Sequence, residues 1–260
     1  MRWRDYRQSG NVTSRGGLIA GGGIGAVVLA VVAMLFGVDP GDVLQQSPSQ
    51  AQAPAANDSM VQFTSSVLAS TEDAWSEIFR QSGEDYPEPQ LATFNGIVQS
   101  ACGTAQSAMG PFYCPRDQTV YVDLSFFTEL RDRFGAAGDF ARAYVIAHEV
   151  GHHVQNVTGQ LQAGGGNEQS VRQELQADCL AGIWGYVANT HQRTTSGQAL
   201  IEPGDVEEAL TAASAIGDDR LQKQSQGYVV PESFTHGSSA ERVAAFRKGF
   251  ETGDLRQCGL

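Results

Sequence analysis

Basic side chains are scarce in this sequence of 260 residues, which has 17 Lys and Arg against 29 Asp and Glu. Four of the 17 are Arg2, Arg4, Arg7 and Arg15, and the only acid among the first 38 residues is Asp5. The rest of the chain therefore has 13 basic and 28 acidic side chains, a net charge of −15. This acidity argues against nucleic acid as a partner and favours a soluble domain.

Cysteine is also sparse, and its spacing argues against a cysteine zinc site. The four cysteines are Cys102, Cys114, Cys179 and Cys258, and no two of them form a C-x-x-C pair. Four thiols agree with an oxidising compartment, and they allow three pairings that the sequence alone does not distinguish. We favour Cys102 with Cys114, which closes a short loop, and Cys179 with Cys258, which attaches the C-terminus to an upstream helix.

Charged residues are absent from Leu18 to Val38, a run of 21 residues that is long enough for one transmembrane helix. The arginines before it predict a cytoplasmic segment over residues 1–17 and an extracytoplasmic, periplasmic or cell-surface domain after it. A cleaved signal peptide is the alternative, with Ala51-Gln52-Ala53 as its cleavage site, although the apolar run is longer than usual for one. Gly17, Gly21 and Gly25 recur every fourth residue, which would permit a homodimer through the membrane helix.

The region after the apolar run divides into a linker and one domain. Residues 39–58 are rich in Gln, Ser, Ala and Pro and predict a flexible linker, and residues 59–260 are long enough for a single domain. Apolar spacing predicts helices over 60–80, 124–134, 204–216 and 239–250, and strands over 91–100 and 119–123. The expected fold class is α+β, mostly helical with a small sheet, preceded by one transmembrane helix.

A zinc-binding pattern stands at residues 148–152, where the sequence reads His-Glu-Val-Gly-His. The preceding residues 139–147 contain no Pro or Gly and predict a helix, on which His148 and His152 share one face. Glu149 lies about 100° round the axis, so it can act as a general base beside the metal without binding it. The longer metzincin pattern is excluded, because Gln155 and Thr158 occupy the positions of its glycine and third histidine.

A catalytic zinc needs a third protein ligand, and we predict Glu174. Residues 170–181 predict a second helix, on which Glu174 and Asp178 lie one turn apart. Asp178 can then accept a hydrogen bond from the nitrogen of His148 that does not bind the metal. Glu168 is the competing ligand, but it lies beside the glycine run at 164–166 and lacks a paired Asp.

These motifs make the chain resemble the bacterial neutral zinc metallopeptidases, a membrane-anchored family of the gluzincin type with the pattern His-Glu-x-x-His followed by Glu-x-x-x-Asp. The resemblance extends over most of the region after the linker, at Cys102-Gly103, Gly110–Pro115, Val120–Asp123, Ala215–Arg220 and Phe234–Gly237. It implies a zincin-like domain with His148, His152 and Glu174 on Zn²⁺.

The segment from Thr235 to Val243 is similar to the Thr-His-Pro-x-x-x-x-Arg segment of related membrane-associated peptidases, with Gly237 in place of Pro. That similarity implies that His236 contacts the substrate oxygen and that Arg242 orients or reinforces the site. The alternative is a loop histidine beside a helix start, with Arg242 on the solvent face. Tyr228 is a second candidate donor to the substrate oxygen.

Two functions agree with this sequence. The first is a membrane-anchored zinc endopeptidase that cleaves extracytoplasmic polypeptides, with residues 119–123 as an edge strand that binds the substrate backbone, or alternatively a central strand. The second is a non-catalytic, zinc-stabilised domain that binds cell-envelope proteins. Glu149 favours the first, because a purely structural zinc site has no need of a base.

Overall fold

The computed structural model of the chain describes residues 1–16, 53–106, 109–162 and 164–260. Its helices are α3 (Ser59–Gln81), α4 (Leu124–Asp132), α5 (Asp139–Val157), α6 (Gly166–Thr190), α7 (Asp205–Ala215), α8 (Asp218–Gln226) and α9 (Ser239–Thr252), with short 3-10 turns η1 (Trp3–Asp5), η3 (Pro231–Ser233) and η4 (Leu255–Cys258). Its strands are β1 (Val12–Ser14), β2 (Gln90–Phe94), β3 (Ile97–Ser100), β4 (Gly103–Gln106), β5 (Phe112–Cys114) and β6 (Thr119–Asp123). The described residues confirm the predicted α+β class, mostly helical with small sheets.

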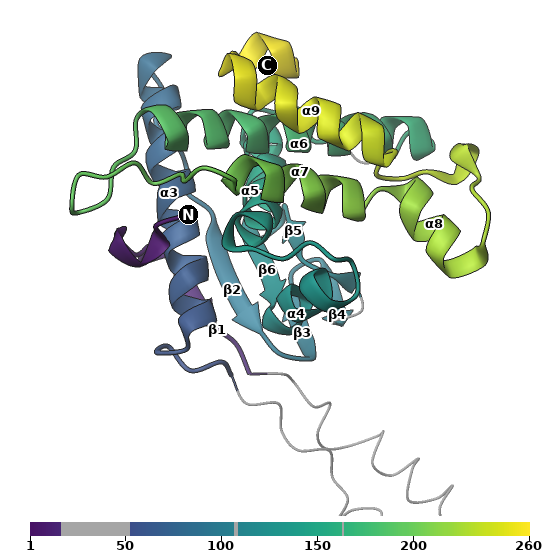
Figure 1. Cartoon of the computed structure of the whole chain (residues 1–260), viewed down its shortest axis with the longest axis horizontal. Coiled ribbons are helices and arrows are strands. Elements are labelled where there is room, and N and C mark those ends of the chain that lie inside the picture. The colour runs from purple at the N-terminus through teal and green to yellow at the C-terminus, as the bar shows by residue number, and fades with distance from the viewer. Residues whose placement is uncertain (17–52, 107–108, 163) are drawn as a thin grey trace, which may run out of the picture.

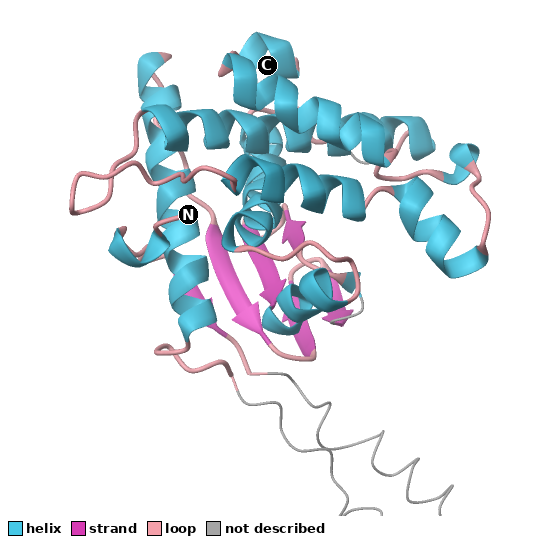
Figure 2. Ribbon diagram, in the orientation of Figure 1, coloured by secondary structure: helices cyan, strands magenta, loops and turns pink. Residues whose placement is uncertain are grey.

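Helix α5 lies at the centre of the molecule, between the main sheet and a layer of helices (Figures 1 and 2). It packs on β5 and β6 on one side and on α6 and α7 on the other, and α9 covers α6 and α7. Phe140 of α5 stacks on Trp184 of α6 with ring centroids 5.4 Å apart, and both side chains are fully buried. Burial of such large aromatic surfaces fixes α5 and α6 against each other.

The main sheet has the order β1-β2-β6-β5, and every pair is parallel except β5 with β6. All five residues of β6 are buried, with Leu91 of β2 on one side of Val120 and Tyr113 of β5 on the other. The prediction that residues 119–123 form an edge strand is therefore wrong, and the central alternative is correct. The edge strand next to β6 is β5, whose three residues are too few for an alternating pattern to be recognised in the sequence.

The predicted strand over 91–100 is two strands, and this prediction is also corrected. Gly96 adopts φ of +86° between β2 and β3, a left-handed conformation that glycine favours, and the chain turns there. Its backbone N–H donates to Asp123 Oδ2 at 2.8 Å. β3 then pairs antiparallel with β4 in a separate two-stranded sheet. Helix α8 was not predicted either, because residues 218–226 are almost entirely polar.

Residues 1–16 pack against the folded domain. β1 lies parallel to β2 at the edge of the main sheet. The buried Trp3 ring contacts Phe63 edge-on at 5.5 Å, and its Nε1 donates to Asp139 Oδ2 at 2.9 Å. Arg7 pairs with Asp73 at 2.7 Å on the surface of α3. The first residues of the chain therefore belong to the same folded unit as the helices.

This packing differs from the predicted division of the chain, in which residues 1–17 lie in the cytoplasm and the domain lies across the membrane. The positive-inside rule counts charges beside an apolar run and contains no information on tertiary contacts. Residues on opposite sides of a bilayer could not form a common sheet. The structure therefore requires residues 1–16 and the described part of the domain to lie on the same side of any membrane.

The predicted transmembrane segment 18–38 lies outside the described residues, as do Gly17, Gly21 and Gly25, on which the expected dimer rests, and most of the linker 39–58. Among the residues that the structure describes, no helix combines the length and the apolar character needed to cross a bilayer. The end of the linker is described, because Asp58 caps α3 by accepting from the backbone N–H of Met60 at 2.7 Å.

Both favoured disulfides are present, and the described cysteines include no free thiol. Cys102–Cys114 joins the start of β4 to the end of β5. Cys179–Cys258 joins α6 to η4 across a sequence separation of 79. The second bond therefore attaches the C-terminal turn to the helix that carries Glu174.

Replacing Cys258 with Ser should lower the free energy of unfolding by about 4 kcal/mol, because the bond closes a long loop in the unfolded chain. Urea unfolding followed by tryptophan fluorescence measures this loss. Thiol labelling with mass spectrometry should find Cys179 free and Cys102 still oxidised. A labelled Cys102 in this variant would contradict the pairing.

Candidate active site

Helix α5 holds the predicted metal-binding motif in the interior of the protein. His148 and Glu149 are buried and His152 is half-buried. The helix begins at Asp139, where the Glu208 carboxylate accepts from the backbone N–H of Phe140 at 2.9 Å. A cap from α7 therefore fixes the start of the active helix.

The glycine inside the motif allows α5 and α6 to approach closely. A Cβ on Gly151 would lie 2.8 Å from the backbone carbonyl oxygen of Ala177, closer than real side chains come. A side chain at this position would therefore push the two helices apart. The contact brings Glu174 of α6, one turn before Asp178, opposite the two histidines.

Three donor groups of the motif converge on one point. The ligand atoms of His148, His152 and Glu174 all lie within 4.8 Å of one another. His148 Nε2 lies 3.0 Å from Glu174 Oε2, and His152 Nε2 lies 3.4 Å from Glu174 Oε1. Two donors at about 2.0–2.1 Å from one tetrahedral ion would be about 3.3 Å apart, so both separations fit zinc. The set of two imidazoles and one carboxylate is also the set that zinc hydrolases use.

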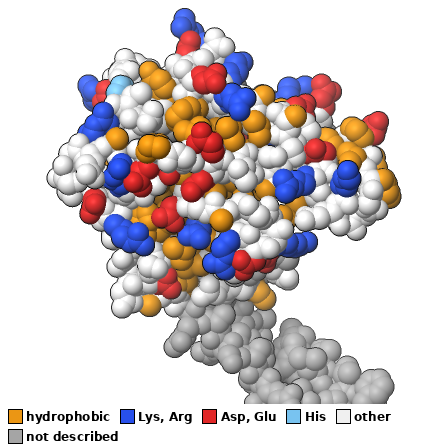
Figure 3. All heavy atoms as spheres, in the orientation of Figure 1, with side chains coloured by type: hydrophobic (Ala, Val, Ile, Leu, Met, Phe, Trp, Pro, Cys, Tyr) orange, Lys and Arg blue, Asp and Glu red, His pale blue; other side chains and the backbone are white. Residues whose placement is uncertain are grey.

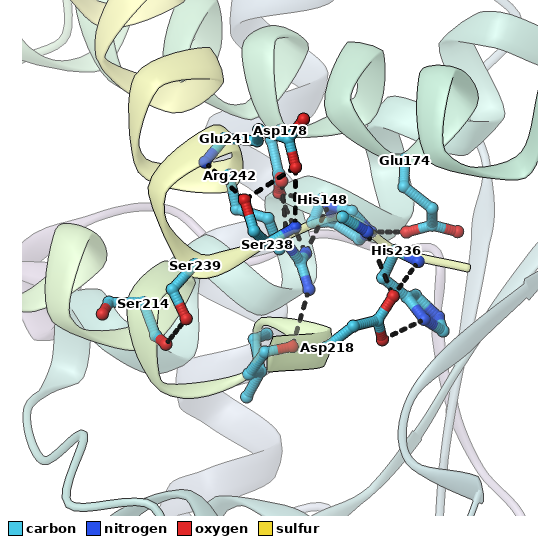
Figure 4. Close-up of polar contacts among 12 residues, drawn as sticks. His148, Glu174, Asp178, Ser214, Asp218, His236, Ser238, Ser239, Glu241 and Arg242 are labelled. Carbon is cyan, nitrogen blue, oxygen red and sulfur yellow. Dashed lines mark hydrogen bonds and ion pairs between the residues drawn. The ribbon is translucent and has the colours of Figure 1, made fainter. Parts of the chain in front are cut away.

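Asp178 is buried and contacts the ring nitrogen of His148 that faces away from Glu174, the position that its spacing predicted. Its Oδ1 lies 2.8 Å from His148 Nδ1, which leaves Nε2 to face Glu174. Arg242 donates to the same carboxylate through Nε at 2.8 Å and Nη2 at 3.0 Å, and the Tyr144 hydroxyl donates at 2.5 Å. Figure 4 shows His148 with Asp178 on one side and Glu174 on the other.

The charges of this cluster stabilise one another. Burial alone would raise the pKa of Asp178, but Arg242 and His148 hold it at about 2. Burial would likewise lower the pKa of His148, but Asp178 and Glu174 raise it to about 10. A metal-free site at neutral pH therefore holds a proton that a metal ion must displace, because zinc binds neutral imidazole.

Arg242 lies beside Asp178 at the cavity, and its Nη2 is 3.5 Å from Nδ1 of His148. It is 3 % exposed, and its Nη1 donates to the backbone carbonyl of Ile216 at 3.3 Å. The alternative of a solvent-facing Arg242 is therefore excluded. Its contacts with Asp178 place Arg242 where it could orient the site through that carboxylate, the role that the family resemblance implies.

Glu149 faces the same cavity as the three donors. Its burial raises the pKa of its carboxyl group, and the neighbouring histidines act in the opposite direction. A carboxylate with a raised pKa is a better proton acceptor than one in water. Glu149 therefore meets the requirements of a general base without occupying a ligand position.

His236 lies on the loop before α9 and also lines this cavity. The Asp218 carboxylate holds the loop by accepting from the backbone N–H groups of Thr235 at 2.7 Å, His236 at 2.6 Å and Gly237 at 3.1 Å. Asp218 Oδ1 also lies 3.4 Å from His236 Nδ1, a contact visible in Figure 4. Nδ1 is engaged in this way, so Nε2 is the nitrogen that can reach a substrate oxygen.

The cavity has a volume of about 500 Å³ and opens to the surface. Its lining includes the three donors, Glu149 and His236. Its other walls are mainly apolar, formed by Met109, Phe126, Phe134, Val145, Ile216 and Leu221. Residues 110–113, which lead into and form the edge strand β5, line it as well. An extended chain could therefore lie along β5 beside the donor group.

Glu168, Tyr228 and the neighbouring histidine His153 are not part of the donor group. Glu168 is exposed and pairs with Arg172 at 2.9 Å, so it does not compete with Glu174. His153 is buried, and its Nδ1 forms a hydrogen bond of 2.9 Å with the Tyr113 hydroxyl. Tyr228 is 62 % exposed and is not among the cavity residues.

The sequence reasoning missed three residues of the site. Tyr144 is one turn before His148 on the same face of α5, a spacing that could have identified it. Asp218 belongs to a segment that carried the family resemblance, but no role was assigned to it. Gln155 was considered only as a departure from the metzincin pattern, yet its side chain contacts His152 at 2.8 Å.

The family model described as "Putative neutral zinc metallopeptidase" matches residues 1–260. The uncharacterized protein YpfJ of Escherichia coli strain K12 is 46% identical over 287 residues, covering 99% of this chain and 98% of the relative. The uncharacterized protein Mb2605 of Mycobacterium bovis is 42% identical over 248 residues, covering 87% and 84%. No solved structure matches this chain. The chain belongs to the neutral zinc metallopeptidase family.

Proposed function

We propose that this protein is a zinc-dependent endopeptidase that hydrolyses peptide bonds of polypeptides outside the cytoplasm. One observation carries the proposal: His148, His152 and Glu174 converge within 4.8 Å beside the buried Glu149 carboxylate, in a cavity open to the surface. A structural zinc site would close its fourth position with another side chain and would need no base.

His148, His152 and Glu174 would hold the ion. Bound zinc supplies a Lewis acid for the peptide carbonyl and lowers the pKa of water towards about 7. Glu149 then takes the proton of the attacking water and returns it to the leaving amine. Nε2 of His236 donates to the carbonyl oxygen as that oxygen gains charge. Asp178, with Arg242 and Tyr144 behind it, keeps His148 in the required tautomer.

The substrate class follows from the cavity and its edge strand. Strand β5 lies at the end of the sheet order, so a polypeptide in extended form can pair with its backbone. The apolar walls fit side chains of ordinary polypeptides better than they fit a charged polymer. On the face seen in Figure 3, basic and acidic side chains are interspersed, whereas nucleic-acid sites present continuous basic surface.

The location is part of the proposal. Two disulfides support a domain that folds in an oxidising compartment. The single-pass anchor over 18–38, and the dimer through Gly17, Gly21 and Gly25 that rests on it, are not part of the proposal. One crossing would place residues 1–16 on the opposite side from the domain, whereas β1 pairs with β2.

Removal of zinc with a chelator should abolish cleavage of casein by the purified protein, and stoichiometric zinc should restore it. The expected metal content is one zinc per chain. Zinc at that stoichiometry, with no cleavage of casein or of a periplasmic proteome, would contradict the proposal. It would favour a zinc-stabilised domain that binds cell-envelope proteins.

Replacing His236 with Ala should lower kcat about a hundredfold to a thousandfold and leave zinc content unchanged, because the lost donor acts on the transition state. His191→Ala is the matched control, since His191 is an exposed histidine at the end of α6. Steady-state kinetics on a fluorogenic peptide measure both variants. Equal turnover of His236→Ala and the wild type would remove His236 from the site.

A further inference from the structure

The two zinc-binding histidines have different supports. His148 Nδ1 contacts the carboxylate of Asp178, whereas His152 Nδ1 contacts the side-chain amide of Gln155, with 2.8 Å to Oε1. Gln155 is fully buried and lies one turn after His152 on α5. It is not one of the residues that line the cavity.

The orientation of the Gln155 amide is fixed by its partners in α6. Its Nε2 lies 2.7 Å from the backbone carbonyl oxygen of Gln173 and 2.9 Å from Oε1 of Gln176. A backbone carbonyl can only accept a hydrogen bond, so the amide nitrogen must face α6. The amide oxygen must then face His152, and an oxygen can only accept.

Gln176 is oriented in the same way. Its Nε2 donates to the backbone carbonyl of Cys258 at 3.0 Å, so its Oε1 must face Gln155. Cys258 is held in place by its disulfide to Cys179 of α6. Hydrogen bonds therefore run in series from the Cys258 carbonyl through Gln176 and Gln155 to His152. The backbone carbonyls of Cys258 and Gln173 can only accept, so neither amide can be turned round without losing a bond.

We propose that Gln155 is a positioning residue that fixes the tautomer of His152. With Gln155 Oε1 as acceptor, the proton of His152 stands on Nδ1. Nε2, 3.4 Å from Glu174 Oε1, then keeps its lone pair for a metal ion held between the two groups. Gln173 and Gln176 hold Gln155 in this orientation. The inference rests on the proposed zinc site, because the tautomer matters only if Nε2 binds a metal ion.

Gln155→Met tests this role by removing the acceptor while keeping the length of the side chain. In the full-length protein, we expect the zinc affinity to fall about tenfold to a hundredfold, measured by competition with a chelating indicator. Gln160→Met is the matched control, because Gln160 is an exposed glutamine five residues later. It should bind zinc as the wild type does.

A ring proton provides a readout that a merely structural role would not change. In the zinc-loaded wild type, the Nδ1 proton of His152 should give an NMR signal that exchanges slowly with solvent. In Gln155→Met, this proton should exchange with solvent about tenfold faster or more, because it has lost its acceptor. Gln176→Met should have a smaller effect, because Gln155 keeps its bond to the carbonyl of Gln173.

Gln155→Glu distinguishes an effect on the tautomer of His152 from an effect on folding. It also tests the inference if Gln155→Met does not fold. Its carboxylate still accepts from Nδ1 but no longer donates to α6, so zinc affinity should stay within about threefold of the wild type while Tm falls. Gln155→Met that binds zinc as the wild type does, or Gln155→Glu that loses zinc as strongly as Gln155→Met, would overturn the inference. A wild type that binds no zinc would instead refute the proposed function.

Discussion

Replacing Glu149 with Gln should reduce peptide hydrolysis by about a thousandfold or more while leaving one zinc per chain. The amide keeps the size of the side chain, but it cannot take a proton from water at neutral pH. Glu149 lies round the helix axis from the two histidines, so the donor group of His148, His152 and Glu174 should remain intact. The loss should therefore appear in kcat and not in metal content.

Single-turnover cleavage of a fluorogenic peptide, with zinc measured in the same preparation, gives both quantities. Glu168→Gln is the matched control, because it makes the same chemical change on an exposed side chain of α6. Its activity should equal that of the wild type. A Glu149→Gln variant that cleaves at the wild-type rate would show that another group acts as the base.

Replacing Asp178 with Asn should destabilise the protein by about 3–5 kcal/mol, because it leaves the Arg242 guanidinium buried without a counter-charge. Asp178 is fully buried, and Arg242 is 3 % exposed with two nitrogens on that carboxylate. The carboxylate also holds His148 at 2.8 Å, so zinc affinity should fall about tenfold to a hundredfold. Urea unfolding of the zinc-free protein isolates the first effect from the second.

The double variant Asp178→Asn with Arg242→Gln removes both charges and provides the control. It should recover part of the lost stability, because no uncompensated charge then remains in the interior. Zinc affinity should not recover, since the carboxylate acceptor for His148 is still absent. A single Asp178→Asn variant that unfolds within about 0.5 kcal/mol of the wild type would contradict the buried ion pair.

The metal site could be predicted because its geometry is local. His148 with His152 and Glu174 with Asp178 are each one turn apart on a helix, and helix periodicity places such pairs on one face. The meeting of the two helices depends on the close approach at Gly151, which the pattern contains but does not explain. The contact of Arg242 with Asp178 spans 64 residues and was not predicted, because the family resemblance implied only that Arg242 orients or reinforces the site.

Two of the predictions that differ from the structure depend on non-local pairing. The position of β6 in the sheet is set by β5 on one side and β2 on the other, and β5 has only three residues. The place of residues 1–16 depends on the pairing of β1 with β2, far along the chain, whereas the charge rule considers only neighbours of the apolar run. Gln155 escaped notice because its partners, Gln173 and Gln176, lie on another helix.

The central claim is that His148, His152 and Glu174 together bind a catalytic zinc. A zinc K-edge X-ray absorption spectrum of the purified full-length protein tests it most directly, with Glu174→Gln measured beside it. We predict two imidazole nitrogens at about 2.0–2.1 Å, carboxylate oxygen at about 2.0–2.2 Å and no sulfur. We also predict that the spectrum changes in Glu174→Gln. A protein that retains no zinc, or a spectrum that Glu174→Gln leaves unaltered, would contradict the account.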